Sequence, residues 1–365
     1  MISPRQWAVL GIMLLTLAGC QGAAPGDSPA EADSPGSVWV LLPDSATSDR
    51  WETDDRRFFE QAFQELGVDY TITNAEGDAR AQQTQAEQAI TAGAKVLLMV
   101  SLDAGSGAAI VAMAREAGIA IVDYDRLTIQ GPGADVYVSF DNVMVGRTMG
   151  LVLEPLINDL PGTPHVVLLN GGTTDHNATL YRQGYYEVAA PYFERGAWVL
   201  TADQEVPQWD NQQALLLFEQ ILTRDPEVSV VFAANDGLAS SVIAGFRNAG
   251  IDPGEAGILI SGQDATVGGI QNIMAGDQTM TVYKPLKQEV YAAAEVAVRL
   301  MNGEPIDDLT GGRTIFNGTN EIPFVALEPI GVTAQNIAQT VIADGFRSWD
   351  ELCVGEFERY CPADR

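Results

Sequence analysis

Basic residues are scarce in this sequence. Its 365 residues include 20 lysines and arginines against 49 aspartates and glutamates, which gives a formal net charge of -29 at pH 7. A surface with this excess of negative charge repels nucleic-acid phosphates and anionic lipid, so we expect neither as a partner. The hydrophobic share of 46% is nevertheless large enough for two domains of ordinary size.

Histidines and catalytic motifs are also few. His165 and His176 are the two histidines, and no His-Glu-x-x-His motif occurs, so we expect no metal site and no cofactor. No phosphate-binding loop is present, and the glycines of the 105–107 stretch lack the third glycine of a dinucleotide fingerprint. We therefore expect no enzyme. A hydrolase with paired carboxylates at Asp125 and Asp264 stays open at this stage, because both acids follow predicted strands.

Only three cysteines occur, and the first follows an apolar run from Trp7 to Leu17. At eleven residues this run is too short to span a bilayer. Arg5 before the run and small residues before Cys20 resemble a bacterial lipoprotein signal, so we expect cleavage before Cys20 and lipidation of its thiol. The alternative is an ordinary signal peptide with an incidental cysteine.

This signal predicts an extracytoplasmic protein held at the cell membrane by a lipid anchor. The signal peptide would cover residues 1–19. A flexible tether, rich in glycine, alanine, proline and serine, would follow over residues 20–37.

The two remaining cysteines, Cys353 and Cys361, lie close together in a tail that we place at residues 347–365. Disulfides persist in exported proteins, whereas a metal site would require more ligands than this chain offers. We therefore expect these two cysteines to form a disulfide.

Strand-like and helix-like segments alternate along the rest of the chain. The predicted strands cover residues 38–42, 68–73, 95–100 and 119–122, and then 165–169, 198–201, 229–233 and 257–261. The predicted helices cover residues 52–66, 79–92, 108–117, 212–222 and 238–249. Continuous apolar strands that alternate with helices are typical of parallel sheets covered on both faces. Because the alternation occurs in two successive sets, we predict an α/β fold with two doubly wound parallel-sheet lobes.

Three passages of the chain are expected to join these lobes. They are predicted at residues 136–142, 281–285 and 320–329. The predicted N-terminal lobe covers residues 38–141 and 283–325, and the C-terminal lobe covers 142–282 and 326–346.

Polar and aromatic side chains follow the predicted strands, where ligands bind in open parallel sheets. These candidates are Arg50, Trp51, Asp125, Arg126, Asn177, Trp209, Asn235, Asp264 and Lys284. Each hydroxyl of a pyranose both donates and accepts hydrogen bonds, so carboxylates, amides and cations suit it, and tryptophan suits its apolar faces. Any one of these residues alone could be a helix cap, an ion pair or a core aromatic. Their common placement predicts a monosaccharide site.

Several motifs resemble those of the D-xylose-binding branch of the periplasmic sugar-binding proteins. They are Tyr124-Asp125-Arg126-Leu127, Tyr137 to Asn142 with Val145-Gly146, Leu169 to Ala178, Ser261 to Ala265, and Gly276 to Pro285. The resemblance covers about residues 38–346 and implies the type I periplasmic binding protein fold. It also implies sugar-contacting roles for the nine candidates, although Trp209 lies in a locally divergent stretch. Residues 44–48 and His176 depart from the family pattern.

The resemblance implies a monomer whose lobes close on a monosaccharide, with the permease subunits of an ABC importer as partner. An alternative is a sensory protein that presents the sugar to a membrane receptor. The ligand could also be another pyranose, such as glucose or arabinose. A transcriptional repressor with the same fold is disfavoured, because the lipoprotein signal stands where a basic DNA-binding segment would be expected.

Overall fold

The computed structural model describes residues 37–45 and 50–363, and these belong to a compact unit formed by Pro35–Arg365. The predicted signal peptide, the Cys20 anchor and the tether as far as residue 36 lie outside the described residues. Ser37, which the sequence assigned to the tether, is the first residue of a strand. Among the residues that the structure describes, no helix is both long and apolar enough to cross a membrane.

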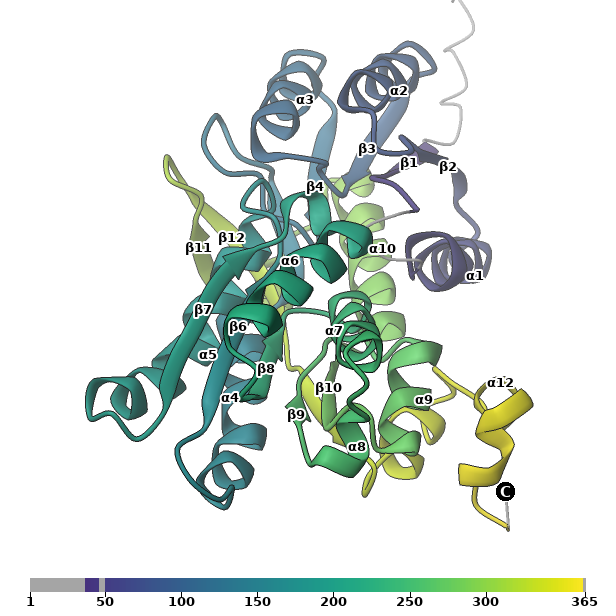
Figure 1. Ribbon diagram of the computed structural model, residues 1–365. Coiled ribbons are helices and arrows are strands. Elements are labelled where there is room, and N and C mark those ends of the chain that lie inside the picture. The colour runs from purple at the N-terminus through teal and green to yellow at the C-terminus, as the bar shows by residue number, and fades with distance from the viewer. Residues whose placement is uncertain (1–36, 46–49, 364–365) are drawn as a thin grey trace, which may run out of the picture. The chain divides into compact units, whose positions relative to one another are not determined.

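Seven strands form the first sheet, in the order β11-β12-β5-β4-β3-β1-β2 (Figure 1). Their bounds are β1 Ser37–Leu42, β2 Asp69–Asn74, β3 Ala94–Met99, β4 Ala120–Tyr124, β5 Val136–Phe140, β11 Thr314–Phe316 and β12 Glu321–Leu327. All neighbouring strands are parallel except β11 and β12. The predicted parallel sheet is therefore confirmed, with one antiparallel edge.

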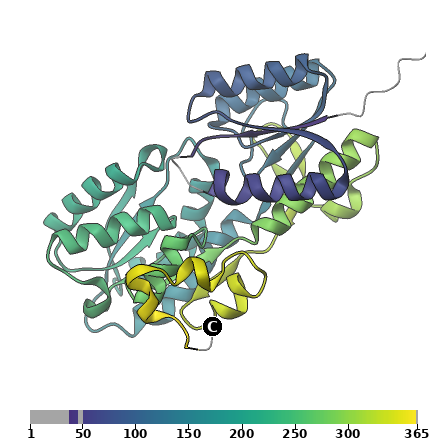
Figure 2. The ribbon, with the colours of Figure 1, turned by 90° about the vertical axis from the view of Figure 1, so that its right-hand side faces the viewer.

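Helices cover both faces of this sheet, because successive side chains of a strand point to opposite faces. Leu41 and Leu97 pack with α2 (Ala79–Thr91) and α3 (Ala104–Glu116). Val40 and Val96 pack with α1 (Arg56–Leu66) and α10 (Leu286–Asn302) on the other face. Figure 2 shows α2 and α3 in blue on one side of the strands and α1 in purple on the opposite side.

The second sheet has four parallel strands in the order β7-β6-β8-β9. Their bounds are β6 His165–Asn170, β7 Val199–Glu205, β8 Val228–Ala233 and β9 Leu259–Ile260. The helices of this part are α4 Asn142–Asn158, α5 His176–Glu194, α6 Asn211–Arg224, α7 Asp236–Asn248, α8 Pro253–Ala256 and α9 Val267–Ala275. Helices α4 and α5 pack closely at Gly146, where a Cβ atom would lie 1.9 Å from the carbonyl oxygen of Tyr181.

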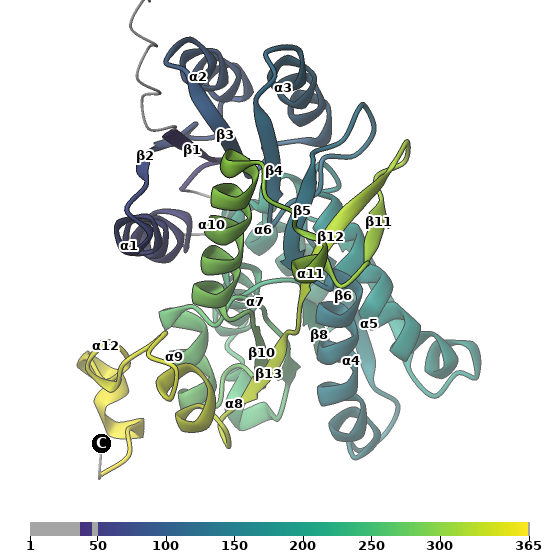
Figure 3. The same ribbon diagram turned by 180° about the vertical axis from the view of Figure 1, so that it is seen from behind.

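The chain passes between the two parts three times, as predicted. It leaves the first sheet after β5 and enters α4, and it returns through β10 (Met280–Tyr283) into α10. It leaves again after β12 into β13 (Ile330–Thr333), which pairs antiparallel with β10. Figure 3 shows β10 and β13 side by side beyond the first sheet. Residues 326 and 327 still pair with β5, so the first sheet extends slightly past the lobe boundary predicted from the sequence.

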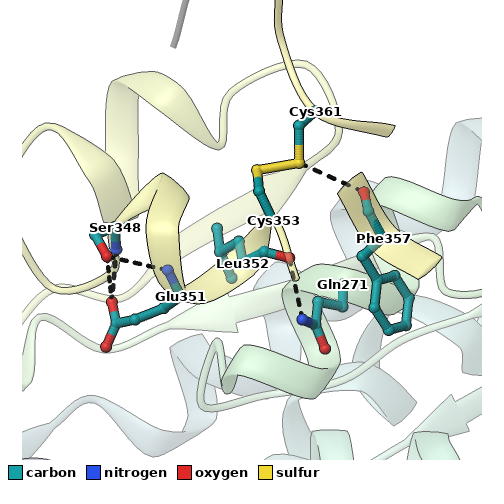
Figure 4. The surroundings of a disulfide bond; sticks show 7 residues. All are labelled: Gln271, Ser348, Glu351, Leu352, Cys353, Phe357 and Cys361. Carbon is teal, nitrogen blue, oxygen red and sulfur yellow. Dashed lines mark hydrogen bonds between the residues drawn. A yellow bond between two sulfur atoms is a disulfide. The ribbon is translucent and has the colours of Figure 1, made fainter. Parts of the chain in front are cut away.

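The C-terminal segment adds three short elements. They are a π-helical turn at Ala338–Ile342, the helix α12 at Trp349–Leu352, and a 3-10 helix at Gly355–Tyr360. The last two pack on α9. Cys353 and Cys361 are joined by a disulfide (Figure 4). The carbonyl oxygen of the buried Leu352 accepts a hydrogen bond from Gln271 Nε2 in α9 at 3.0 Å. The segment predicted as a tail is therefore attached to the second part of the fold.

Candidate functional site

One pocket is lined by all nine candidates taken from the sequence. The structure adds three lining residues that sequence reasoning missed: Asp175, Tyr181 and Gln263. Eight of the candidates follow strands β1, β4, β6, β7, β8 and β9, so they meet at the carboxyl ends of both sheets. The ninth, Lys284, follows β10 of the β10–β13 pair. The space they enclose has about 310 Å³ free of atoms, part of it open to solvent.

Asp125 is the point where the charged groups of the pocket converge. Its Oδ2 atom accepts hydrogen bonds from Lys284 Nζ at 2.9 Å and from Arg50 Nη1 at 3.0 Å. Burial alone would raise the pKa of Asp125, but the charges of Lys284 and Arg50 outweigh burial and hold that pKa well below its usual range. Asp125 is therefore ionised whenever the protein is near neutral pH.

Arg50 is held from behind by acids that do not line the pocket. Its Nε and Nη2 atoms each donate to a different carboxylate oxygen of Asp55 at 2.8 Å, and Nη2 also lies 3.4 Å from Glu289 Oε2. A bidentate pair of this kind fixes the plane of the guanidinium group. The guanidinium carbon of Arg50 lies 4.2 Å from the ring centre of Trp51. Arg50 therefore presents one nitrogen, Nη1, to Asp125 in a fixed orientation.

The pKa values of Glu289 and Asp55 are raised, whereas that of Asp125 is lowered. Burial, and then the negative charge of Asp125, raises the pKa of Glu289 well above its ordinary value. Burial also raises the pKa of Asp55, although Arg50 and the Tyr124 hydroxyl oppose this shift. Tyr124 Oη donates to Asp55 Oδ1 at 2.5 Å. Neither sequence motif nor strand-end position pointed to Asp55 or Glu289, because both act from within helical segments behind the pocket.

Asn177 lines the pocket, as its position suggested, and it also forms hydrogen bonds with Asp125. Its side-chain nitrogen donates to the carbonyl oxygen of Asp125 at 2.9 Å and to Asp125 Oδ1 at 3.1 Å. Its side-chain oxygen accepts from Asn142 Nδ2 at 2.8 Å. The side-chain amide of Asn177 therefore orients Asp125, whose backbone has a positive φ of 60°.

Asp264 reaches the same cluster from the second sheet. Its Oδ1 atom lies 3.8 Å from both Arg50 Nη1 and Lys284 Nζ. Asp264 and Ala265 have positive φ angles of 100° and 48°. Non-glycine residues adopt such angles at a cost of about 1–3 kcal/mol, and they cluster at functional sites. The backbone N–H of Asp264 donates to Val282 O at 3.0 Å, which helps to hold this conformation.

The aromatic wall of the pocket combines Trp51 with Trp209. Arg126 lies 5.5 Å from the ring centre of Trp51, and its Nε atom lies 3.3 Å from Asp175 Oδ2. The Trp209 ring contacts Gly171, where a Cβ atom would lie 2.2 Å from the indole. Trp209 Nε1 is buried and has no hydrogen-bond partner among the described residues. The indole N–H of Trp209 therefore donates to no described backbone or side-chain atom.

Three further features singled out in the sequence are Asn235, His176 and the 44–48 loop. Asn235 lines the pocket and also caps α7, because its Oδ1 atom accepts the Leu238 N–H at 2.8 Å. His176 opens α5 and is not among the lining residues. In the divergent 44–48 loop, residues 46–48 lie outside the described residues, whereas Asp44 is buried and lines a larger neighbouring cleft.

A histidine and two acids meet elsewhere in the fold. The side chains of His165, Asp225 and Glu227 approach one another within 4.8 Å, near the amino-terminal ends of β6 and β8. His165 Nδ1 lies 2.6 Å from Asp225 Oδ2, and Asp225 also accepts from Thr201 Oγ1 at 2.8 Å. The group lies at the opposite ends of these strands from the pocket. Its atoms are engaged with one another as an ordinary hydrogen-bonded cluster.

Comparison with known proteins agrees with this geometry. Residues 39–305 match the family model described as a periplasmic binding protein domain. The D-xylose-binding periplasmic protein of Escherichia coli strain K12 is 36% identical over 311 residues, which cover 85% of this chain and 90% of that protein. The multiple sugar-binding periplasmic receptor ChvE of Rhizobium radiobacter is 27% identical over 353 residues, with 93% and 99% of the two chains covered.

A solved structure supports the same assignment. The carbohydrate transporter solute binding protein of Chloroflexus aurantiacus, in complex with D-glucose, superposes with a TM-score of 0.77. It is 26% identical, and the match covers 86% of this chain and 97% of that one. The expected fold is confirmed, and the relatives are sugar-binding transport proteins, which disfavours the open alternative of a hydrolase. The chain belongs to the periplasmic sugar-binding proteins with the type I fold, in the branch that contains the D-xylose-binding proteins.

Proposed function

We propose that this protein captures D-xylose in the pocket between its two lobes. The observation that carries the proposal is the buried cluster in which Asp125 meets Lys284 and Arg50, with Asp264 approaching from the second sheet. Groups from both lobes thus converge on one small space. A sugar bound there would contact both lobes at once, so its binding energy would favour the closed arrangement.

The chemistry of the lining favours a neutral polyhydroxylated ligand. The carboxylates of Asp125, Asp175 and Asp264 would repel an anion and accept hydrogen bonds from hydroxyls. Lys284 and Arg126 supply donors, and the indole N–H of Trp209 is available to a ligand oxygen. The apolar faces of a pyranose suit the adjacent tryptophan rings.

The relatives support D-xylose as the first sugar to test. The D-xylose-binding proteins of Escherichia coli and Haemophilus influenzae are 36% and 34% identical to this chain. Calorimetric titration with D-xylose, D-glucose and L-arabinose is the decisive experiment. We expect D-xylose to bind with a Kd in the micromolar range or below. Binding of none of the three sugars would overturn the proposal, and preference for glucose or arabinose would overturn its assignment to xylose.

Capture implies a change in the separation of the two lobes. The passages after β5, β10 and β12 are the segments about which the lobes would turn. Small-angle scattering should show a smaller radius of gyration with saturating sugar. An unchanged radius would indicate a protein that is rigid or already closed without ligand.

We propose further that the protein is an extracytoplasmic lipoprotein that works as a monomer and delivers the sugar to ABC permease subunits. The support for the anchor is the apolar run that ends in Leu17-Ala18-Gly19-Cys20. Cys20→Ala should block processing or release the protein from the membrane fraction. Unchanged processing and fractionation of this variant would contradict the anchor.

Delivery to a receptor is the second candidate, because one relative is named a multiple sugar-binding periplasmic receptor. Deletion of the gene should abolish uptake of labelled xylose if the protein serves an importer. Unchanged uptake, together with loss of a sugar response, would favour the receptor.

A further inference from the structure

One arginine of the C-terminal segment contacts the walls of the pocket from both sheets. Arg347 Nη1 and Nη2 donate to Asp54 Oδ1 and Oδ2 at 3.1 and 2.9 Å. Its Nε atom donates to the carbonyl oxygen of Ala265 at 3.0 Å. The side chains of Arg347 and Asp54 are only 7% and 4% exposed. A buried bidentate pair of this kind has little freedom to change its geometry.

The first partner, Asp54, belongs to the short turn that carries part of the pocket. This π-helical turn begins at Trp51, which lines the pocket, and ends at Asp55, the bidentate partner of Arg50. Because Asp54 lies within this turn, the contact with Arg347 restrains the segment that carries the indole ring and Asp55. Arg57 Nη2 adds a second contact to Asp54 Oδ1 at 3.1 Å. The turn follows β1 of the first sheet.

The second partner, Ala265, directly follows the pocket residue Asp264 after β9 of the second sheet. Both residues have positive φ angles. Beside the Asp264 N–H bond to Val282, the Ala265 N–H donates to Thr281 Oγ1 at 3.2 Å. Arg347 supplies the hydrogen bond to the carbonyl end of this pair. A backbone in such a costly conformation persists only where several contacts determine it.

Phe346, which precedes Arg347, contacts a third stretch that carries a pocket residue. The Phe346 ring stacks on Tyr283 with 4.9 Å between ring centres, and Tyr283 immediately precedes Lys284. The Tyr283 hydroxyl donates to Asp344. Residues 344–347 therefore contact the three stretches that carry Trp51, Asp264 and Lys284. The α9 contact and the disulfide described above hold the following residues of the same segment.

We propose that Arg347 is a positioning residue of the sugar site. It holds the Trp51 turn and the Asp264 loop at the spacing that the bound sugar requires, without contacting the sugar itself. This inference rests on the proposed function. It predicts that loss of Arg347 weakens binding through displacement of pocket residues, in addition to any loss of stability.

The test compares three single variants by calorimetry with the sugar that the wild-type protein binds best. Arg347→Ala and Asp54→Asn should each weaken binding between about threefold and about thirtyfold, as expected for residues that act on a site through others. Arg247→Ala is the control, because Arg247 is an arginine outside the pocket whose half-exposed side chain pairs with the largely buried Asp277 at 2.6 Å. This control should keep the wild-type Kd while its melting temperature falls.

Two further measurements separate positioning from general stability. The double variant Arg347→Ala/Asp54→Asn should lose less affinity than the sum of the two single losses, because both changes break the Arg347–Asp54 contact. The losses should still not coincide, since Arg347 also contacts Ala265 and Asp54 also pairs with Arg57. Arg347→Lys should recover part of the affinity, since an ammonium group restores a charge beside Asp54 but lacks the planar fork that also reaches Ala265. Arg347→Lys and Asp54→Asn keep the test informative if Arg347→Ala does not fold.

The outcomes are distinct. Wild-type binding of none of the sugars would overturn the proposed function and this inference with it. Normal wild-type binding, with an unchanged Kd for Arg347→Ala and Asp54→Asn, would overturn this inference alone. Additive losses in the double variant would likewise overturn the role of the Arg347–Asp54 contact.

Discussion

Lys284 Nζ lies 2.9 Å from Asp125 Oδ2, although 159 positions separate the two residues in the sequence. Lys284 follows β10, at one of the passages between the lobes, and Asp125 follows β4 of the first sheet. Both side chains are nearly inaccessible to solvent. A buried ion pair is costly to form unless other hydrogen bonds complete it, and here Arg50 and Asn177 do so. The ion pair between Lys284 and Asp125 can therefore form only when the chain has folded and brought Arg50 and Asn177 next to it.

Removal of the charge of Asp264 should weaken sugar binding. Asp264→Asn keeps the side-chain shape and tolerates the positive φ angle of this position, since asparagine is one of the residues enriched there. A hydrogen bond to a charged group contributes about 1.5–3 kcal/mol, so affinity should fall by roughly 10- to 150-fold in calorimetry. Asp252→Asn is the control, because this exposed cap of α8 lies outside the pocket. Equal affinities of the two variants would show that Asp264 does not contact the ligand.

Displacement of Trp209 should also weaken sugar binding, and it can be achieved without substituting a polar side chain. In Gly171→Ala the new Cβ atom would lie 2.2 Å from the Trp209 ring, so the indole must move. Loss of an aromatic stacking partner costs about 1–3 kcal/mol for rings bound by proteins, and we expect calorimetry to show a loss of this order. Gly268→Ala is the matched control, since a Cβ atom there would have no described atom within 4 Å. Wild-type affinity in Gly171→Ala would mean that Trp209 is not part of the binding surface.

The pH dependence of stability should reveal the buried carboxyl of Asp123. Burial raises its pKa to about 7, although the backbone N–H and hydroxyl of Thr128 oppose the shift. Because the folded-state pKa is raised, the stabilisation from the protonated acid is complete below about pH 4 and is lost as the pH rises to about 7. Asp123→Asn removes this titration.

Urea unfolding of the wild-type protein and Asp123→Asn at several pH values tests this assignment. The free energy of unfolding of the variant, relative to wild type, should rise between about pH 4 and pH 7 by up to roughly 4 kcal/mol and then level off. A difference that stays constant over this range would show that Asp123 does not titrate there.

The disulfide of the C-terminal segment can be tested by peptide mapping without reductant. Trypsin cleaves after Arg347 and Arg359, which places Cys353 and Cys361 in the peptides 348–359 and 360–365. Mass spectrometry of protein from an oxidising compartment should find these two peptides joined, and reduction should separate them. Two free thiols in such protein would contradict the pairing.

Much of the fold could be predicted because it depends on local patterns. Buried parallel strands such as β3 contain continuous apolar runs, here Val96 to Met99, and turn residues such as Gly93 mark the boundary between helix and strand. Boundaries were less certain where local geometry changes within a segment. The helix expected from Glu52 is in the structure a π-helical turn followed by α1 from Arg56. That turn is stabilised by Arg347, which lies almost 300 positions away, and no local pattern contains this contact.

The sequence by itself determined which side chains could reach the pocket. Residues that directly follow parallel strands meet at one edge of a sheet, so the nine candidates could be found from strand positions and motifs alone. The tertiary structure alone decided what each of them does there. Asn177 orients Asp125, and Asp55 and Glu289 support Arg50 from helical segments with no strand-end signal. The physical reason is that buried charges are stable only in a complete set of partners, and these partners come together only when distant parts of the chain pack.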